Sequence, residues 1–237
     1  MLTATRKTDD KQVMAKDAER SDGPFYCSFC ESDATLRKGI VVSHHFAHKP
    51  PITCEYGTGE SELHRQTKQE IYDFLSTDAG VTKLALERNL KTVRPDVSCY
   101  IGKTPIAIEV QLSSLSLERI AHRTLEYAKK KIYVLWISPN DERLTHSHLT
   151  IRSWEKWVHA LYFGRIYFWD DQQVAVYNFI RRRYRKVHYH PRLLHKVDLV
   201  HDLEPVHRSA WTGHGLSLPD CKLFADTSDI RNEDAQQ

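Results

Sequence analysis

Long apolar stretches are absent from this chain of 237 residues. No run reaches the roughly twenty apolar residues that a membrane-spanning helix needs, so we expect no membrane segment. Residues 1–23 also lack the apolar centre of a secretory signal peptide, which favours a cytoplasmic protein. No internal repeat is visible. Since 41% of the residues are hydrophobic, the chain can bury one core with a small additional module.

The net charge of +3 is too small to indicate a nucleic-acid partner by itself. Most of the excess lies in IRRRYRKVHYHPRLLHK, residues 180–196. Such a stretch can follow a phosphate backbone by charge and stack a base on its interleaved tyrosine. A solvated basic strand is the alternative. The predicted DNA contacts are Arg181, Arg182, Arg183, Arg185 and Lys186.

Cysteine is scarce and unevenly placed, because three of the five cysteines lie between residues 27 and 54. Without a secretion signal, this pattern favours a metal site over disulfides. Cys27, Cys30 and Cys54 supply three ligands for a tetrahedral zinc ion, and His48 is the favoured fourth, with His45 as the alternative. Four protein ligands leave no open position, so the predicted zinc is structural. The competing interpretation is reduced thiols beside surface histidines.

Apolar periodicity predicts the order of the main elements. The order from residue 61 is helix, three strands, helix, strand. A further helix and a hairpin follow, and the first two dozen residues suit a polar hairpin. The predicted segments are 2–7 with 11–18 (hairpin), 61–76 (helix), 81–87, 94–101 and 105–112 (strands), 116–130 (helix), 131–138 (strand), 153–164 (helix), and 165–169 with 174–180 (hairpin).

The stretch RPDVSCYIGKTPIAIEVQL is the most informative part of the chain. Gly102–Lys103 suits a two-residue type II′ turn. That register places Asp96 opposite Glu109, where two like charges repel. A divalent cation removes the repulsion, and oxygen ligands suit Mg²⁺ or Mn²⁺. An accidental acidic pair, or another turn register, is the alternative.

The segment GESELHRQTK, residues 59–68, aligns three polar side chains on the helix that precedes these strands. Glu60, His64 and Lys68 recur every four residues and therefore share one face. If this helix packs beside the sheet, Glu60 and His64 point toward the same carboxylates. Glu62 lies about 200° around the helix from Glu60 and should face elsewhere.

Several motifs occur in an order that resembles the competence protein CoiA family, within the PD-(D/E)xK nuclease superfamily. They are CxxC, HFAH, ESELH, RPDV, IEVQLS, an arginine followed by EYA, and YVLWI. The resemblance implies an α/β (α+β) fold with a restriction-endonuclease-like αβββαβ core and a small amino-terminal zinc-binding β module. We divide the chain into that module (1–57), the nuclease core (58–140), a carboxy-terminal helix, hairpin and basic extension (141–202), and a tail without assigned structure (203–237).

In that superfamily the aspartate and glutamate hold a catalytic divalent metal, which implies Asp96 and Glu109. Glu60 is implied to contact the metal directly or through water. One departure concerns Gln111, which stands where the superfamily usually has lysine and which can orient water but carries no charge. The candidates for the missing charge are Lys68, His64 and Arg94.

The resemblance therefore implies a Mg²⁺- or Mn²⁺-dependent deoxyribonuclease that acts on DNA in uptake, recombination or defence, together with unidentified DNA-processing proteins. A DNA-binding protein that has lost turnover through Gln111 is the alternative. A zinc-dependent interaction module is a third class, but it leaves the opposed carboxylates unexplained. The predicted catalytic residues are Glu60, His64, Asp96, Glu109 and Gln111.

Overall fold

The structure of the chain is a computed structural model that describes residues 1–54, 56, 59–147, 149–183, 187–197 and 199. It divides into two compact units. The first contains Met1–Leu112 and Val134–Pro139, and the second contains Ser113–Tyr133 and Asn140–Gln237. Both predicted metal-binding groups lie in the first unit. The fourfold division of the chain stays a prediction.

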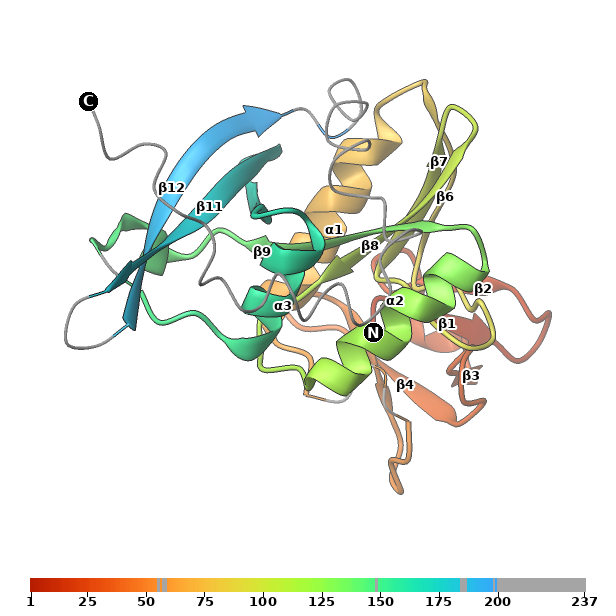
Figure 1. Cartoon of the computed structure of the whole chain (residues 1–237). Coiled ribbons are helices and arrows are strands. Elements are labelled where there is room, and N and C mark those ends of the chain that lie inside the picture. The colour runs from red at the N-terminus through yellow and green to blue at the C-terminus, as the bar shows by residue number, and fades with distance from the viewer. Residues whose placement is uncertain (55, 57–58, 148, 184–186, 198, 200–237) are drawn as a thin grey trace. The chain divides into compact units, whose positions relative to one another are not determined.

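The first unit begins with a five-stranded sheet in the order β2-β1-β3-β4-β5 (Figure 1). The predicted amino-terminal hairpin is confirmed, because Thr3 pairs with Met14 and Thr5 with Gln12. A short 3-10 helix (Arg20–Asp22) follows this hairpin. The strands are β1 (Thr3–Arg6), β2 (Gln12–Met14), β3 (Phe25–Tyr26), β4 (Asp33–Arg37) and β5 (His45–His48).

Alternation along β4 and β5 decides which side chains form the core of this sheet. Ala34 and Leu36 of β4, and Phe46 and His48 of β5, are buried, whereas the residues between them are more exposed. Phe46 packs edge-on against Phe25, with 5.0 Å between the ring centroids. The period of two therefore places His48 on the inner side and His45 on the outer side.

Four more strands of the first unit follow the order β9-β8-β7-β6. They are β6 (Val81–Leu86), β7 (Val97–Ile101), β8 (Thr104–Val110) and β9 (Tyr133–Pro139). Helix α1 (Glu62–Ser76) precedes them, and the Ser61 hydroxyl caps it by accepting from the His64 amide at 3.2 Å. Ile71 and Leu75 of α1 are fully buried.

The chain order of elements in the nuclease-like region is α1-β6-β7-β8-α2-β9, with α2 spanning Leu117–Lys129. This is the predicted order of helix, three strands, helix and strand. The predicted fold class, a mixed α/β protein with an αβββαβ core behind a small β module, is confirmed.

The β7–β8 hairpin has the predicted register. Ser98 pairs with Ala107, and Ile101 with Thr104, which leaves Gly102 and Lys103 as the turn. Gly102 has φ = +58°, the left-handed conformation that glycine adopts at little cost at the first position of a type II′ turn. Continuing this register toward the strand ends sets Asp96 opposite Glu109.

The second unit contains α2, a 3-10 helix (Glu142–Thr145), α3 (Ser153–Leu161) and the strands β10 (Ile166–Asp170), β11 (Gln173–Arg183) and β12 (Val187–Val197). The three strands pair antiparallel in sequence order. The helix predicted at 153–164 and the hairpin after it are thereby confirmed. Arg181, Arg182 and Arg183 end β11, whereas Arg185, Lys186 and the tail from residue 203 lie outside the described residues.

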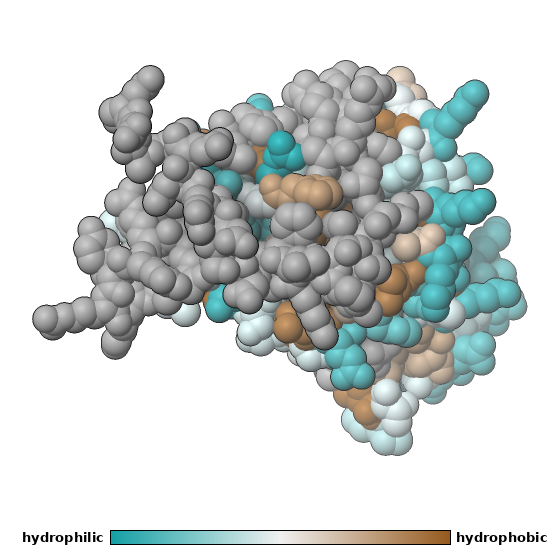
Figure 2. Space-filling model, viewed as in Figure 1, coloured by the Kyte–Doolittle hydropathy of each residue, from teal (hydrophilic) through white to brown (hydrophobic). Residues whose placement is uncertain are grey.

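Figure 2 shows the distribution of hydrophilic and apolar side chains on one face of the described residues. On the face drawn in Figure 2, apolar side chains form small patches separated by hydrophilic ones. Among the described residues, none of the helices has the length and apolar character needed to cross a membrane.

Candidate catalytic centre and metal cluster

Three predicted catalytic side chains meet beside the first turn of α1. His64 Nε2 lies 3.1 Å from Asp96 Oδ2, and His64 Nδ1 lies 3.7 Å from Glu60 Oε1. One donor atom from each of Glu60, His64 and Asp96 lies within 4.8 Å of the others. Residues from a helix start and a strand start thus form a group that can hold a cation.

Lys68 occupies the inner side of this group. Its Nζ lies 2.6 Å from Glu87 Oε1 and 3.4 Å from Asp96 Oδ1, and it also contacts the Glu60 carboxylate. Burial alone would lower the pKa of Lys68, but the carboxylates of Glu87, Glu60 and Asp96 raise it. Lys68 is therefore a buried, charged ammonium.

Glu87 is the buried acid at the end of β6. The backbone amides of Leu2 and Thr3 donate to its two carboxylate oxygens at 3.0 and 3.1 Å, and the Thr3 hydroxyl donates at 3.1 Å. Burial opposes ionisation, but Lys68 and then Arg94 hold the pKa of Glu87 well below its ordinary value. The amino-terminal strand thus stabilises a charge in the nuclease-like region.

Asp96 is oriented by the neighbouring strand. The Val110 amide donates to Asp96 Oδ2 at 2.9 Å, and the Asp96 carbonyl accepts from the Glu87 amide at 3.0 Å. Its carboxylate therefore keeps one direction relative to β8, with Oδ2 toward His64 and Oδ1 toward Lys68.

Solvent reaches this group from one side. The side chains of His64 and Asp96 are 23% and 16% exposed, whereas that of Lys68 is 1% exposed. A phosphate that approaches the group therefore meets His64 and Asp96 before it meets Lys68.

The other two predicted catalytic residues are more deeply placed: Glu109 lies on β8, and Gln111 directly follows the end of that strand. Glu109 is 1% exposed and Gln111 is 9% exposed. Glu109 does not belong to the three-residue donor group of Glu60, His64 and Asp96. Glu62, predicted to face elsewhere, does so: its carboxylate accepts from the Ser43 amide at 2.9 Å and pairs with Arg65 at 2.7 Å.

A second group gathers Cys27, Cys30, His48 and Cys54, whose donor atoms all lie within 4.8 Å of one another. Tetrahedral zinc with sulfur and nitrogen ligands spans distances of this size, at about 2.3 Å to sulfur and about 2.0 Å to nitrogen. The knuckle around Cys27 is closed by the Glu31 amide, which donates to the Cys27 carbonyl at 2.9 Å. This Cys3His group can hold a metal ion such as zinc.

His48, rather than His45, joins the cysteines. His48 Nε2 lies 3.4 Å from Cys30 Sγ. Burial lowers the pKa of His48, which favours the neutral ring that a metal ligand requires. His45 Nδ1 instead lies 2.8 Å from the Ser43 carbonyl.

Arg94, from the RPD motif, lies between the two groups. Its Nη1 is 3.9 Å from Cys27 Sγ and 4.0 Å from Glu87 Oε2, and its guanidinium lies 4.8 Å from the centroid of the Tyr56 ring. Sequence reasoning named Lys68 and Arg94 only as candidates for a missing charge, and it missed the amides of Leu2 and Thr3. No sequence signal reports those amides, because every residue except proline carries one.

Replacing Lys68 by methionine should lower the free energy of unfolding by about 3–5 kcal/mol, because it leaves buried carboxylates without their counter-charge. Urea denaturation followed by circular dichroism measures the change. Lys16→Met is the control, because Lys16 pairs with Asp73 at 3.1 Å on the surface and should cost less than about 1 kcal/mol. Equal losses in the two variants would show that Lys68 does not hold the acids together.

Two family models match the chain. The family described as "Competence protein CoiA, nuclease-like domain" matches residues 60–192, and that described as "Competence protein CoiA, N-terminal domain" matches residues 7–57. The chain belongs to the CoiA family. The nuclease-like domain contains Glu60, His64 and Asp96. The four residues of the Cys3His group lie within the range matched by the CoiA amino-terminal domain.

One curated relative is the competence protein CoiA of Bacillus subtilis (strain 168). It is 28% identical over 116 residues, which cover 48% of this chain and 31% of the relative. The match thus spans less than a third of that CoiA protein. No solved structure matches the chain significantly.

Proposed function

We propose that this CoiA-family chain is a metal-dependent nuclease that hydrolyses phosphodiester bonds of DNA at the solvent-facing edge formed by His64 and Asp96. The observation that carries the proposal is the meeting of Glu60, His64 and Asp96 within 4.8 Å of one another inside a nuclease-like domain. Two carboxylates and an imidazole on a partly exposed edge form a donor set for a divalent cation.

The ion pairs of the group leave Asp96 Oδ2 and His64 on its solvent side for such an ion. Glu60 pairs with the Met1 ammonium at 2.8 Å and with Lys68, whereas Asp96 Oδ1 lies 3.4 Å from Lys68 and Asp96 Oδ2 faces His64. When bound, a divalent ion would neutralise charge on the phosphate and acidify a water molecule. Because one donor is nitrogen, Mn²⁺ suits Glu60, His64 and Asp96 better than Mg²⁺, which takes oxygen ligands.

The protein's own residues prepare this edge. The Val110 amide and Lys68 hold the Asp96 carboxylate in place, and Asp96 in turn orients the imidazole of His64. We assign to Lys68 the positive charge that the superfamily usually supplies from the position of Gln111. Since Lys68 is buried, it acts through Asp96 and Glu60 and does not touch the substrate.

Asp96 is common to two ligand sets, the pair Asp96–Glu109 predicted from sequence and the observed group with Glu60 and His64. Glu60→Gln and Glu109→Gln separate them, because each removes one carboxylate charge without changing the shape of the side chain. Manganese affinity measured by calorimetry should fall more in the variant that loses a true ligand. If both variants bind manganese as tightly as the wild type, neither proposed ligand set holds the ion.

For the Cys3His group we propose a structural zinc ion, because four protein ligands leave no open coordination position. DNA contacts from Arg181, Arg182 and Arg183 of β11 remain part of the proposal, as do Arg185 and Lys186. A link with DNA uptake or recombination draws on the name of the Bacillus subtilis relative, and a defence role fits the same residues.

Cleavage assays on linear, circular, single-stranded and branched DNA test the activity. We expect cleavage that requires a divalent ion, proceeds faster with Mn²⁺ than with Mg²⁺, and stops with EDTA. In His64→Ala the preference for Mn²⁺ should weaken, because the nitrogen donor is gone. If the protein binds DNA but cuts no form of it with any divalent ion, it is a DNA-binding protein without nuclease turnover. The uncharged Gln111 and the burial of Lys68 would then explain the lack of cleavage.

A further inference from the structure

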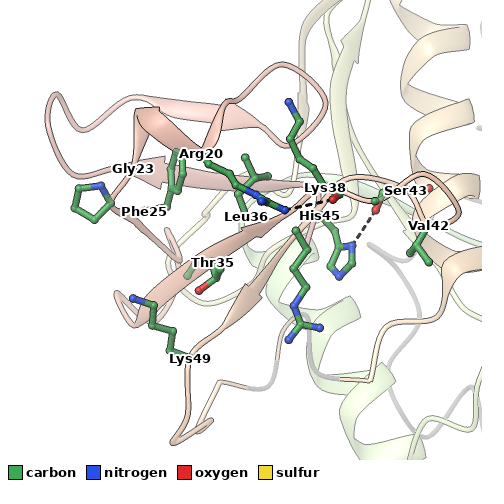
Figure 3. Close-up of a pocket in the computed structure, with 14 residues that line it drawn as sticks. Arg20, Gly23, Phe25, Thr35, Leu36, Lys38, Val42, Ser43, His45 and Lys49 are labelled. Carbon is green, nitrogen blue, oxygen red and sulfur yellow. Dashed lines mark hydrogen bonds between the residues drawn. The ribbon is translucent and has the colours of Figure 1, made fainter.

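A groove in the amino-terminal sheet carries positive charge that neither metal-binding group uses. Its cavity volume is about 590 Å³, and β4, β5 and the segment before β3 line it (Figure 3). Four cationic side chains contribute to the lining, and no aspartate or glutamate does. The four cationic residues are Arg20, Arg37, Lys38 and Lys49.

Within the described residues, three of the four cations form no ion pair, although Asp33 acts on Lys49 from beyond ion-pair distance. Lys38 pairs with Glu19 at 2.8 Å. Arg20, Arg37 and Lys49 are exposed, and no carboxylate oxygen lies within 4.0 Å of their charged groups among the residues that the structure describes. Such a groove attracts an anion, and its length along two strands suits a chain of phosphates rather than a single one.

The loop between β4 and β5 exposes apolar side chains at one end of the groove. Ile40 and Val41 are 106% and 92% exposed, and Val42, which lines the groove, is 41% exposed. Consecutive branched aliphatic residues in water are costly, and a folded protein rarely presents them without a partner.

Contacts fix this loop to the start of α1. The Ser43 amide donates to Glu62 Oε1 at 2.9 Å, and Glu62 pairs with Arg65 at 2.7 Å. Arg65 Nη1 in turn donates to the Glu60 carbonyl at 2.6 Å. Figure 3 shows Val42 and Ser43 beside this helix. The exposed loop is thus connected through two side chains to the backbone of a candidate catalytic residue.

We propose that the groove and the loop bind double-stranded DNA, with phosphates of one strand along Arg20, Arg37 and Lys49 and with Ile40 and Val41 inserted at a base step. Aliphatic side chains serve as wedges in proteins that kink a duplex, whereas unpaired bases are more often stacked on aromatic rings. A protein partner or a lipid surface would also cover apolar residues, but the unpaired cations beside a phosphodiesterase-like centre favour DNA. The inference rests on the proposed function only in taking DNA as the substrate.

Binding experiments on the full chain with Asp96→Asn separate this surface from cleavage. Fluorescence anisotropy with a labelled 30-base-pair duplex would be measured at several salt concentrations. Arg37→Gln/Lys49→Gln should reduce the slope of log K against log salt by about 0.9 for each phosphate that the protein no longer neutralises. Lys11→Gln/Lys103→Gln, which removes two exposed lysines outside the groove, is the matched control and should leave affinity and slope nearly unchanged.

Ile40→Ser/Val41→Ser should behave differently from the charge variant. We expect affinity to fall on the order of tenfold with an unchanged salt slope, because the variant removes apolar surface and leaves the release of counterions as it was. The proposal is overturned if Arg37→Gln/Lys49→Gln has the same salt slope as the control variant. It is also overturned if Ile40→Ser/Val41→Ser keeps its DNA affinity but loses binding to anionic vesicles or loses self-association. Loss of duplex binding in both variants, in a protein that cuts no DNA, would support this surface while rejecting the nuclease.

Discussion

Replacing Asp96 by asparagine is expected to reduce metal-dependent DNA cleavage by at least about 10²–10³-fold, the scale on which a single preorganised charge contributes to catalysis. The asparagine keeps the shape of the side chain, and its oxygen can still accept from the Val110 amide. It removes the negative charge that faces His64 and Lys68 and that the proposed metal ion would use. DNA affinity measured without a divalent ion should not fall, because the Asp96 carboxylate is negatively charged and does not attract phosphate.

The measurement is a single-turnover cleavage assay with Mn²⁺, paired with anisotropy for binding. Asp73→Asn is the matched control, since Asp73 lies on α1 but is exposed and pairs with Lys16 at 3.1 Å. That variant should cleave at the wild-type rate. If Asp96→Asn also cleaves at the wild-type rate, the hydrolytic centre lies elsewhere.

The second large effect concerns the Cys3His group. Cys27→Ser should abolish stoichiometric zinc and lower the free energy of unfolding by more than about 3 kcal/mol, because binding energy at a structural zinc site is also folding energy. The physical reason lies in the local core: Cys27 is fully buried and the five-stranded sheet around it is small. Burial also raises the pKa of Cys54 to about 12, so its thiolate requires a neighbouring cation.

Elemental analysis and thermal melting of purified protein measure both consequences. Cys99→Ala is the control, because Cys99 is 3% exposed but lies on β7 away from the other cysteines. It should retain full zinc and lose only the stability expected for a small cavity. Wild-type protein that contains no metal and melts normally would exclude a structural zinc ion.

The hairpin register shows what the sequence could predict. Alternation from Val97 to Val110 and a glycine at the turn determine which residues face each other, because both signals are local. The sequence also predicted that Glu60 and His64 share one helix face and point toward Asp96, because spacing along a helix is a local signal too. The sequence favoured His48 over His45 as the fourth ligand, and alternation along β5 puts His48 on the inner face with Phe46.

Other parts of the site depend on contacts between distant segments. The Glu87 carboxylate accepts from the amides of Leu2 and Thr3, which lie 85 and 84 residues away in the chain. Backbone amides leave no pattern in the sequence that would predict this contact. Lys68 lies on the helix face predicted from sequence, but its three acidic partners come from separate connecting segments: before α1, after β6 and before β7. Its burial therefore follows from packing that only the structure reveals.

The contact between β1 and Glu87 restricts how such proteins can be recombined. Leu2 and Thr3 donate to the Glu87 carboxylate of the nuclease-like domain, and Arg94 of that domain approaches the sulfur of Cys27. A chimaera joined between the amino-terminal and nuclease-like domains would bury Glu87 without the Leu2 and Thr3 amides that donate to its carboxylate. Natural or engineered exchange of the amino-terminal segment therefore has to carry matching partners on both sides of the junction.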